Sequence, residues 1–209
     1  MSEASAKSAI YHDGNRDLQD RFDTRRIADR IEEVLLSDVI SDHDKAFIEA
    51  RDMFFLATAD DAGMPNCSYK GGEPGFVRVV DEHTVAFPNF DGNGMYLSMG
   101  NVLVNPSVGM LFIDFERGHR MRLNGIASID ANDPLMAEYP EAQFIVRVRA
   151  REVFPNCPRY IHHYKLVERS RFVPKKGKAT PVPSWKCADW SADALPAADP
   201  ARDPGREVV

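Results

Sequence analysis

The residue types best suited to bind a phosphorylated ligand are concentrated in residues 66–76, which read Asn-Cys-Ser-Tyr-Lys-Gly-Gly-Glu-Pro-Gly-Phe. Lys70 and Ser68 can hold a phosphate, and the glycines let backbone N–H groups approach a ligand closely. The order of residues fits neither a Walker motif nor a dinucleotide-binding fingerprint. The alternative is a glycine-rich hairpin connection that binds nothing.

A second polar cluster, residues 88–96, lies between an expected strand and an expected helix and reads Pro-Asn-Phe-Asp-Gly-Asn-Gly-Met-Tyr. Backbone N–H groups at the start of a helix, together with the helix dipole, favour an anion. Ser98 and Asn101 add two polar groups on the same helix. The simpler interpretation is that Asp91 or Asn93 only caps this helix and that Ser98 or Asn101 faces water.

Two arginines form a third candidate group. Arg120 and Arg122 alternate with apolar residues, so both side chains are expected on one face of a strand. That face is either a ligand wall or an ordinary solvent-exposed surface.

The histidines and cysteines do not form a recognisable metal or catalytic site. His162 and His163 are adjacent on an expected helix and point about 100° apart, so they do not converge on one ion. The cysteines are odd in number and lack Cys-x-x-Cys spacing, which argues against a disulfide framework or a zinc site and for a reducing compartment. A catalytic Cys-His pair has no local sequence signature here.

The composition limits the class of protein. The chain has 209 residues, enough for one domain with a sizeable core. Its net charge of −6 and pI near 5.5 argue against a general nucleic-acid or anionic-membrane binder. The N-terminus lacks the charged and apolar regions of a signal peptide, and no window resembles a membrane span. We therefore expect a cytoplasmic protein.

The elements that must position the candidate residues follow from hydrophobic spacing. An apolar stripe predicts a first helix, formed by Ile27, Ile31, Val34 and Leu35. Ser41 and Asp44 resemble a capping box that starts a second helix. Strand-like runs follow at residues 53–59, 65–69, 76–80, 84–88, 107–115, 120–129 and 144–153. Short turns at residues 60–63, 81–83 and 116–119 predict antiparallel hairpins.

Further helices are expected between and after the strands. Met95, Met99, Val102 and Leu103 follow helical spacing, and Asn105-Pro106 ends the run. Residues 134–139 suggest a minor helix. Another is expected after Asn156 or Cys157, with Pro158 in its first turn and an end near Val167.

These elements predict three regions along the chain. Residues 1–20 form a flexible N-terminal arm, residues 21–172 form the folded domain with its flanking helices, and residues 173–209 form a proline-rich C-terminal tail that is partly docked. Trp185 and Trp190 are costly to leave in water, so this part of the tail is expected to dock on the barrel or on a second subunit. A wholly mobile tail is the alternative. The fold class is mainly β (α+β), a six- to seven-stranded antiparallel barrel with flanking helices.

Several strings occur in an order that resembles the pyridoxamine 5′-phosphate oxidase-like, FMN-binding split-barrel family. They are residues 54–65, 70–79, 93–106, 101–112 and 122–127. The resemblance implies a split β-barrel that forms a homodimer, with FMN bound between the two chains. It also implies an FMN-dependent oxidoreductase that acts on a small molecule, with a nicotinamide as the electron donor.

The two polar clusters, interpreted through this resemblance, give a set of candidate cofactor-binding residues. They are Asn66, Ser68, Tyr69, Lys70, Gly71, Gly72, Asn89, Asn93, Ser98, Asn101 and Arg122. A flavin supplies the redox chemistry itself, so the lack of an acid/base pair does not argue against an enzyme. A flavin-binding carrier or sensor without turnover is the alternative.

The sequence also departs from the oxidases that give the family its name. Those enzymes carry a Ser-Arg-Lys run before the inserted helix, where this chain reads Asn93-Gly94-Met95-Tyr96. Oxidation of a vitamin B6 phosphate is therefore not expected, and Lys70, with Arg78 or Arg122, must supply the positive charge. Relatives on this barrel bind F420 or haem, and in a haem protein His162 or His163 would be the candidate ligand.

Overall fold

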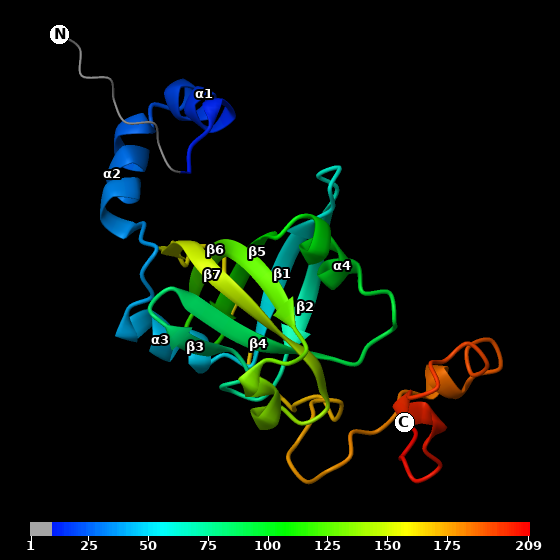
Figure 1. Cartoon of the computed structure of the whole chain (residues 1–209). Coiled ribbons are helices and arrows are strands. Elements are labelled where there is room, and N and C mark those ends of the chain that lie inside the picture. The colour runs from blue at the N-terminus through cyan, green and yellow to red at the C-terminus, as the bar shows by residue number, and fades with distance from the viewer. Residues whose placement is uncertain (1–9) are drawn as a thin grey trace.

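The computed structural model describes residues 10–209. Its centre is a seven-stranded antiparallel sheet with the strand order β2-β1-β5-β6-β7-β4-β3 (Figure 1). The strands are β1 (Met53–Ala59), β2 (Pro65–Gly71), β3 (Arg78–Asp81), β4 (Thr84–Phe90), β5 (Ser107–Asp114), β6 (His119–Asp130) and β7 (Ala142–Asn156). Strands β2 and β3 are the two edges, so the barrel is open between them. The predicted fold class, a mainly β antiparallel split barrel with flanking helices, is confirmed.

The core forms because apolar side chains alternate along the strands. In β1, Phe54, Leu56 and Thr58 are buried, while Phe55 is partly exposed and Ala57 is exposed. The Phe54 ring lies 5.0 Å from the Phe87 ring and 5.3 Å from the Phe112 ring, measured between centroids. These contacts tie β1, β4 and β5 together, and burial of such side chains is the main stabilising term.

Strands β6 and β7 approach each other very closely at Gly125. The register shifts between Asn124 and Gly125. A Cβ atom at Gly125 would overlap the backbone oxygen of Arg149 and crowd the Val148 side chain. Glycine is therefore the residue that lets the two long strands remain paired through this irregularity.

Three of the expected helices are present. Helix α2 spans Arg25–Leu35, and α3 spans Asp42–Glu49 with the predicted Ser41/Asp44 capping box. Helix α4 spans Leu97–Val104, between β4 and β5. The minor helix is the 3-10 turn η1, Pro134–Glu138.

The N-terminal segment is more regular than expected. Helix α1 spans Asp13–Arg21 within the predicted arm, because His12 and Asn15 form a capping box and Arg16 pairs with Asp29 of α2 at 2.6 Å. Residues 13–21 of the expected flexible arm are therefore helical, while residues 1–9 lie outside the described part of the chain. Both helices project away from the sheet (Figure 1), and the apolar stripe of α2 is exposed.

The helix expected after β7 is wrong. Residues 157–172 contain no helix, and their backbone instead runs beside the β5–β6 turn. The Tyr164 N–H donates to the Phe115 carbonyl, and the two rings lie 5.3 Å apart. A short helix needs an apolar face packed on something, and Tyr160, which would belong to that face, is 91% exposed.

The C-terminal tail is held together by short turns. It contains the 3-10 turns η2 (Ser184–Cys187) and η3 (Pro200–Arg202), and Val182 pairs with Val208. Lys186 links it to the β4–α4 connection through Asp91 at 2.5 Å. Within residues 10–209, no helix is both long and apolar enough to cross a membrane.

Candidate functional site

Strand β2 divides its candidate residues between two faces. Asn66, Ser68 and Lys70 pair with Thr58, Leu56 and Phe54 of β1, whose side chains point into the barrel. Opposed residues in adjacent strands share a face, so these three also point inward. Tyr69 lies on the other face, where its ring contacts that of Phe55 at 6.2 Å.

Helix α4 is fixed against β1 and β2 by two hydrogen bonds. The Ser98 hydroxyl donates to the Ser68 hydroxyl at 2.9 Å, and the Asn101 amide donates to the Thr58 hydroxyl at 3.1 Å. Because Thr58 is opposite Asn66, the helix runs in the opposite direction to β2. Its N-terminus therefore points toward the end of β2 that carries Lys70.

The first turn of α4 has no side-chain cap. Tyr96, with a φ of 49°, occupies the capping position, and its side chain accepts no hydrogen bond from the helix. Asn93 accepts instead from the Met95 N–H at 3.1 Å, and Asp91 pairs with Lys186. Neither residue caps the helix as the simpler interpretation required. The N–H groups of this turn and the positive end of the helix dipole are thus available to an anion.

Lys70 is a half-buried cation. It has no hydrogen bond or ion pair with any of residues 10–209. Burial lowers the pKa of Lys70 because it penalises the charged form. A bound anion would offset this cost, so Lys70 is suited to hold a phosphate.

Lys70 lines a cavity of about 1040 Å³, referred to below as the Lys70 cavity. Its wall includes the end of β2, the end of β4, the β5–β6 turn and residues 164–174. Among the candidate residues it contains Tyr69, Lys70, Gly71, Gly72 and Asn89. Ligand pockets commonly measure about 300–1000 Å³, so a cofactor of the size of FMN fits.

The glycine loop shapes this cavity without offering every amide to a ligand. The Gly72 N–H donates to the Asp52 carbonyl at 2.9 Å, and the Gly75 N–H donates to the Glu49 carbonyl at 2.7 Å. The space of a Cβ atom at Gly72 is filled by the Phe76 ring. The first two glycines therefore line the cavity, while the Gly72 amide is already engaged.

Asn89 has its own partners at the end of β4. Its amide donates to the Gln143 side-chain oxygen at 2.9 Å and to the Phe90 carbonyl at 3.2 Å. The Tyr96 hydroxyl donates to the same oxygen of Gln143 at 3.0 Å. Asn89 thus holds β4, β7 and the loop before α4 together at the cavity wall.

Six candidate residues do not line the Lys70 cavity. Three of them, Ser68, Ser98 and Asn101, form the contacts that hold α4 against β1 and β2. Arg122 is exposed on the outer face of β6 and lines neither of the two cavities described here. Asn66 faces inward on β2 but does not line them either. Asn93 lines a second cavity, described next. Arg78, the other expected source of charge, pairs with Glu138 at 2.6 Å.

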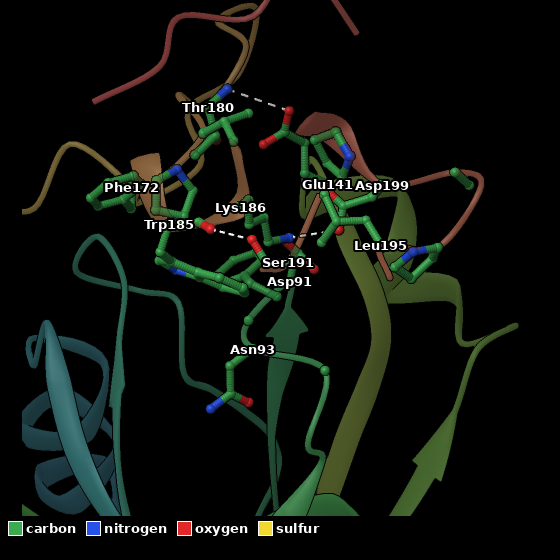
Figure 2. A pocket seen from close by; sticks show the side chains of 18 of the residues that line it. Asp91, Asn93, Glu141, Phe172, Thr180, Trp185, Lys186, Ser191, Leu195 and Asp199 are labelled. Atoms are coloured by element: carbon green, nitrogen blue, oxygen red, sulfur yellow. Dashed lines mark hydrogen bonds and ion pairs between the residues drawn. The ribbon is translucent and has the colours of Figure 1, made fainter. Parts of the chain in front are cut away.

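The second cavity, of about 1130 Å³, lies between the C-terminal tail and the loop before α4 and is called the tail cavity (Figure 2). Lys186 is buried between Asp91 and Asp199 at its wall, with only 3% of the residue exposed. Sequence reasoning missed this group. Its members are too far apart in the chain to share a spacing pattern.

The histidines and cysteines stay separate. Within residues 10–209, no three His, Cys, Asp or Glu side chains gather as metal ligands would. His163 is exposed, with its Nδ1 atom 2.9 Å from the Glu116 oxygen. The exposed Cys157 thiol accepts a hydrogen bond from the Arg159 side chain at 3.1 Å. Hydrogen bonds from the backbone and side chain of Arg159 lower the pKa of Cys157.

Comparison of the sequence with protein-family models identifies the family of the chain. The family model described as Pyridoxamine 5′-phosphate oxidase matches residues 40–168, which cover α3, all seven strands, α4 and Lys70. The chain belongs to the pyridoxamine 5′-phosphate oxidase family. The C-terminal tail lies outside the matched residues. No curated protein matches the chain.

Solved structures with related folds share little sequence with this member of the pyridoxamine 5′-phosphate oxidase family. A putative pyridoxamine 5′-phosphate oxidase from Lactobacillus delbrueckii is 19% identical with a TM-score of 0.46, over 56% of this chain and 95% of its own. An FMN-binding protein from Syntrophomonas wolfei is 11% identical with a TM-score of 0.43, over 67% and 97%. The haem storage protein HutZ from Vibrio cholerae is 18% identical with a TM-score of 0.38, over 57% and 92%.

Proposed function

We propose that the chain is an FMN-dependent oxidoreductase acting on a small molecule. The observation that carries this proposal is the convergence of two anion-binding features, the uncapped N-terminus of α4 and the unpaired Lys70. Both lie at the same end of β2, because the Ser98–Ser68 contact aligns the helix against that strand. A phosphate that belongs to a planar cofactor suits this pair of features better than a free carboxylate, because the adjoining cavity is large.

The residues of the chain have limited tasks in this proposal. When bound, the flavin supplies the hydride-transfer chemistry. Lys70 and the first-turn N–H groups of α4 hold its phosphate, and the glycine loop forms part of the cavity wall. Asn89 and Gln143 keep the loop before α4 in place. No side chain needs to act as a nucleophile.

The proposed assembly is a homodimer, and a nicotinamide is the proposed electron donor. Exposed apolar side chains on α4, in the β1–β2 turn and on β6 support a second copy of the chain. They include Met64, Leu97, Leu103, Val104 and Ile126. Patches of this kind on a soluble protein commonly mark interaction surfaces. We also propose that the protein works in the cytoplasm.

One observation favours a second candidate, a haem-binding protein. His163 is exposed, and only its Nδ1 atom is engaged, by the Glu116 oxygen. This contact fixes the ring and leaves Nε2 free, as in many histidines that ligate metals. A Soret band on haem addition that disappears in His163→Ala would favour this candidate over the flavin.

Titration of the purified protein with FMN tests the proposal. The expected results are a shifted flavin absorbance band and a higher melting temperature in the presence of FMN, since a ligand of the folded state stabilises it. Anaerobic addition of NADH or NADPH should then bleach the bound flavin. A protein that shows neither an FMN spectrum nor a thermal shift would rule out the flavin, and a bound flavin that is never reduced would indicate a carrier or sensor.

A further inference from the structure

One wall of the tail cavity is built from a part of the chain that the family model does not cover. This wall consists of residues 172–206, and the opposite wall consists of residues 90–96 and the start of β7. Figure 2 shows Trp185, Phe172 and Leu195 of the tail around a space that Asp91 and Lys186 close at one side. The cavity volume is about 1130 Å³. Ligand pockets commonly measure about 300–1000 Å³, so this cavity has room for a small-molecule ligand.

Five aromatic side chains line this cavity, from the tail and from the loop before α4. The rings of Trp185 and Trp190 are stacked, with centroids 5.9 Å apart and planes at 17°. Trp190 is nevertheless 73% exposed, so one face of this pair has no partner among residues 10–209. Phe90 and Tyr96 lie on the opposite wall. Large exposed aromatic surface inside a concave site is typical of ligand binding, because flat rings stack on it.

Prolines limit the freedom of the tail around these rings. The cavity is lined by Pro174, Pro181, Pro183, Pro196 and Pro200. Each proline fixes its own φ angle, so the tail loses little conformational entropy when a ligand binds. The cavity is therefore preorganised rather than a gap that closes when empty.

Every charge on the cavity wall already has a partner. Lys186 pairs with Asp91 at 2.5 Å and with Asp199 at 2.8 Å. Arg206 pairs with Glu141 at 2.6 Å. The lining residues contain no other ionisable carboxylate, lysine or arginine. An anionic ligand would find no free cation there, so the cavity favours an uncharged ligand over an anion.

The two indole N–H groups are among the polar groups that the wall offers, beside the side chains of Asn93 and Thr180. Neither Trp185 nor Trp190 donates its N–H to an acceptor among residues 10–209. A carbonyl or hydroxyl oxygen of a ligand can accept from them. The favoured ligand is thus a flat, uncharged aromatic or conjugated molecule with an oxygen at its edge.

The tail cavity adjoins the Lys70 cavity. Both are lined by Phe90, Asp91, Gly92, Phe172 and Pro174. A ligand in the tail cavity is therefore separated from the proposed cofactor by no more than one layer of shared side chains. We infer that the tail cavity binds the substrate and that this substrate is an uncharged aromatic compound. The substrate role rests on the proposed function, whereas the binding of the aromatic compound does not.

The test uses 2-naphthol as an uncharged probe and 2-naphthoate as its charged match. Trp185 and Trp190 are the two tryptophans of the chain, so their emission reports on the tail cavity directly. 2-Naphthol should release or absorb heat in calorimetry and change the tryptophan emission of the full-length protein without FMN. 2-Naphthoate should bind about tenfold more weakly or not at all, because its carboxylate would be unpaired.

Variants separate the two cavities. Trp190→Ala should weaken 2-naphthol binding about tenfold and leave FMN affinity unchanged, and Trp190→Phe should recover most of it. Lys70→Met should instead weaken FMN binding and leave the affinity for 2-naphthol unchanged. Tyr160→Ala removes an exposed ring that lines neither cavity and should change neither affinity. Because Trp190 is largely exposed, its truncation is not expected to unfold the protein.

The outcomes are distinct. Absence of 2-naphthol binding, equal binding of 2-naphthoate, or full binding by Trp190→Ala would overturn the inference while leaving FMN binding intact. Failure of FMN to bind would overturn the proposed function, and the 2-naphthol titration would still decide whether the cavity takes an uncharged aromatic ligand. In the FMN-loaded protein, 2-naphthol should perturb the flavin absorbance band, and an unchanged band at saturation would overturn the substrate role.

Discussion

The Ser98 hydroxyl lies 2.9 Å from the Ser68 hydroxyl and fixes the first turn of α4 against β2. Both residues are largely shielded from solvent, so the bond stabilises the position of the helix more than an exposed one would. Together with the Asn101–Thr58 bond, this contact decides which end of β2 the helix N-terminus faces. That end is the one that carries Lys70.

Ser98→Ala should destabilise the protein by about 1 kcal/mol, the usual contribution of one hydrogen bond. Ser68→Ala should have a similar effect, and the double variant should cost about as much as either single one. Urea denaturation of the four proteins measures this coupling. Additive losses would show that the two hydroxyls do not depend on each other.

Lys70→Met should weaken FMN binding about 10- to 100-fold, because a charged hydrogen bond to the phosphate is lost. The melting temperature of the FMN-free protein should not fall, since the lysine is half-buried without a partner. Arg120→Ala, on the outer face of β6, is the matched control and should bind FMN almost normally. Equal affinities for the two variants would remove Lys70 from the site.

Gly125→Ala should destabilise the fold by about 1–3 kcal/mol, since the new Cβ would overlap backbone of β7 that cannot easily move. Thermal unfolding should show a melting temperature lower by several degrees. Gly100→Ala in α4 is the control of opposite sign. Its Cβ meets open space, so alanine should stabilise the helix by about 0.5–1 kcal/mol. A normal melting temperature for Gly125→Ala would contradict the close approach.

Asp133 should make part of the stability depend on pH. Arg147 donates to it from two nitrogens, at 2.5 and 3.0 Å, and this hydrogen bonding holds the pKa of Asp133 below its ordinary value of 3.8. A lowered folded-state pKa gives a contribution that is present above the unfolded-state pKa and is lost as the pH falls. The stability difference between wild type and Asp133→Asn should therefore shrink below about pH 5.

Thermal unfolding over that pH range measures the effect. Asp61→Asn is the control, because it removes an exposed carboxylate that has no ion pair among residues 10–209. The stability difference between wild type and Asp61→Asn should not shrink as the pH falls. A gap between wild type and Asp133→Asn that is constant with pH would exclude the carboxylate as the cause.

Lys186→Met should release the tail from the barrel. The substitution leaves Asp199 buried without its cation, a change that typically costs about 3–5 kcal/mol. The tryptophan emission should shift to longer wavelength, and the tail should be cleaved faster in limited proteolysis. Lys176→Met, at an exposed lysine, should change neither reading. An unaltered cleavage pattern would show that the Lys186 pairs do not hold the tail.

The sequence by itself determined the strands of this fold. All seven strands were predictable because alternation of apolar residues and short turn signals act over a few neighbouring residues. The Ser41/Asp44 capping box is equally local. The same alternation already places Tyr69 and Lys70 on opposite faces of β2, although both were candidates for one site.

Two sequence expectations failed where tertiary contacts outweighed local preference. The segment after β7 has a helix-like start at Pro158, but the Phe115 carbonyl and ring bind Tyr164 and keep the chain non-helical. In the glycine loop, the Gly72 N–H is engaged by Asp52, 20 positions earlier in the chain. Local propensity is a weak preference that such contacts readily overcome.

Only the tertiary structure decided how the candidate residues combine. Ser68 and Ser98 are separated by 30 positions, and Lys186 and Asp91 by 95. No spacing rule connects such pairs, because the loops between them contribute mainly entropy and leave the contact to packing. The sequence therefore identified Lys70 as a candidate phosphate ligand, whereas the fold placed it at the end of β2 toward which the uncapped end of α4 points and next to the aromatic cavity of the tail.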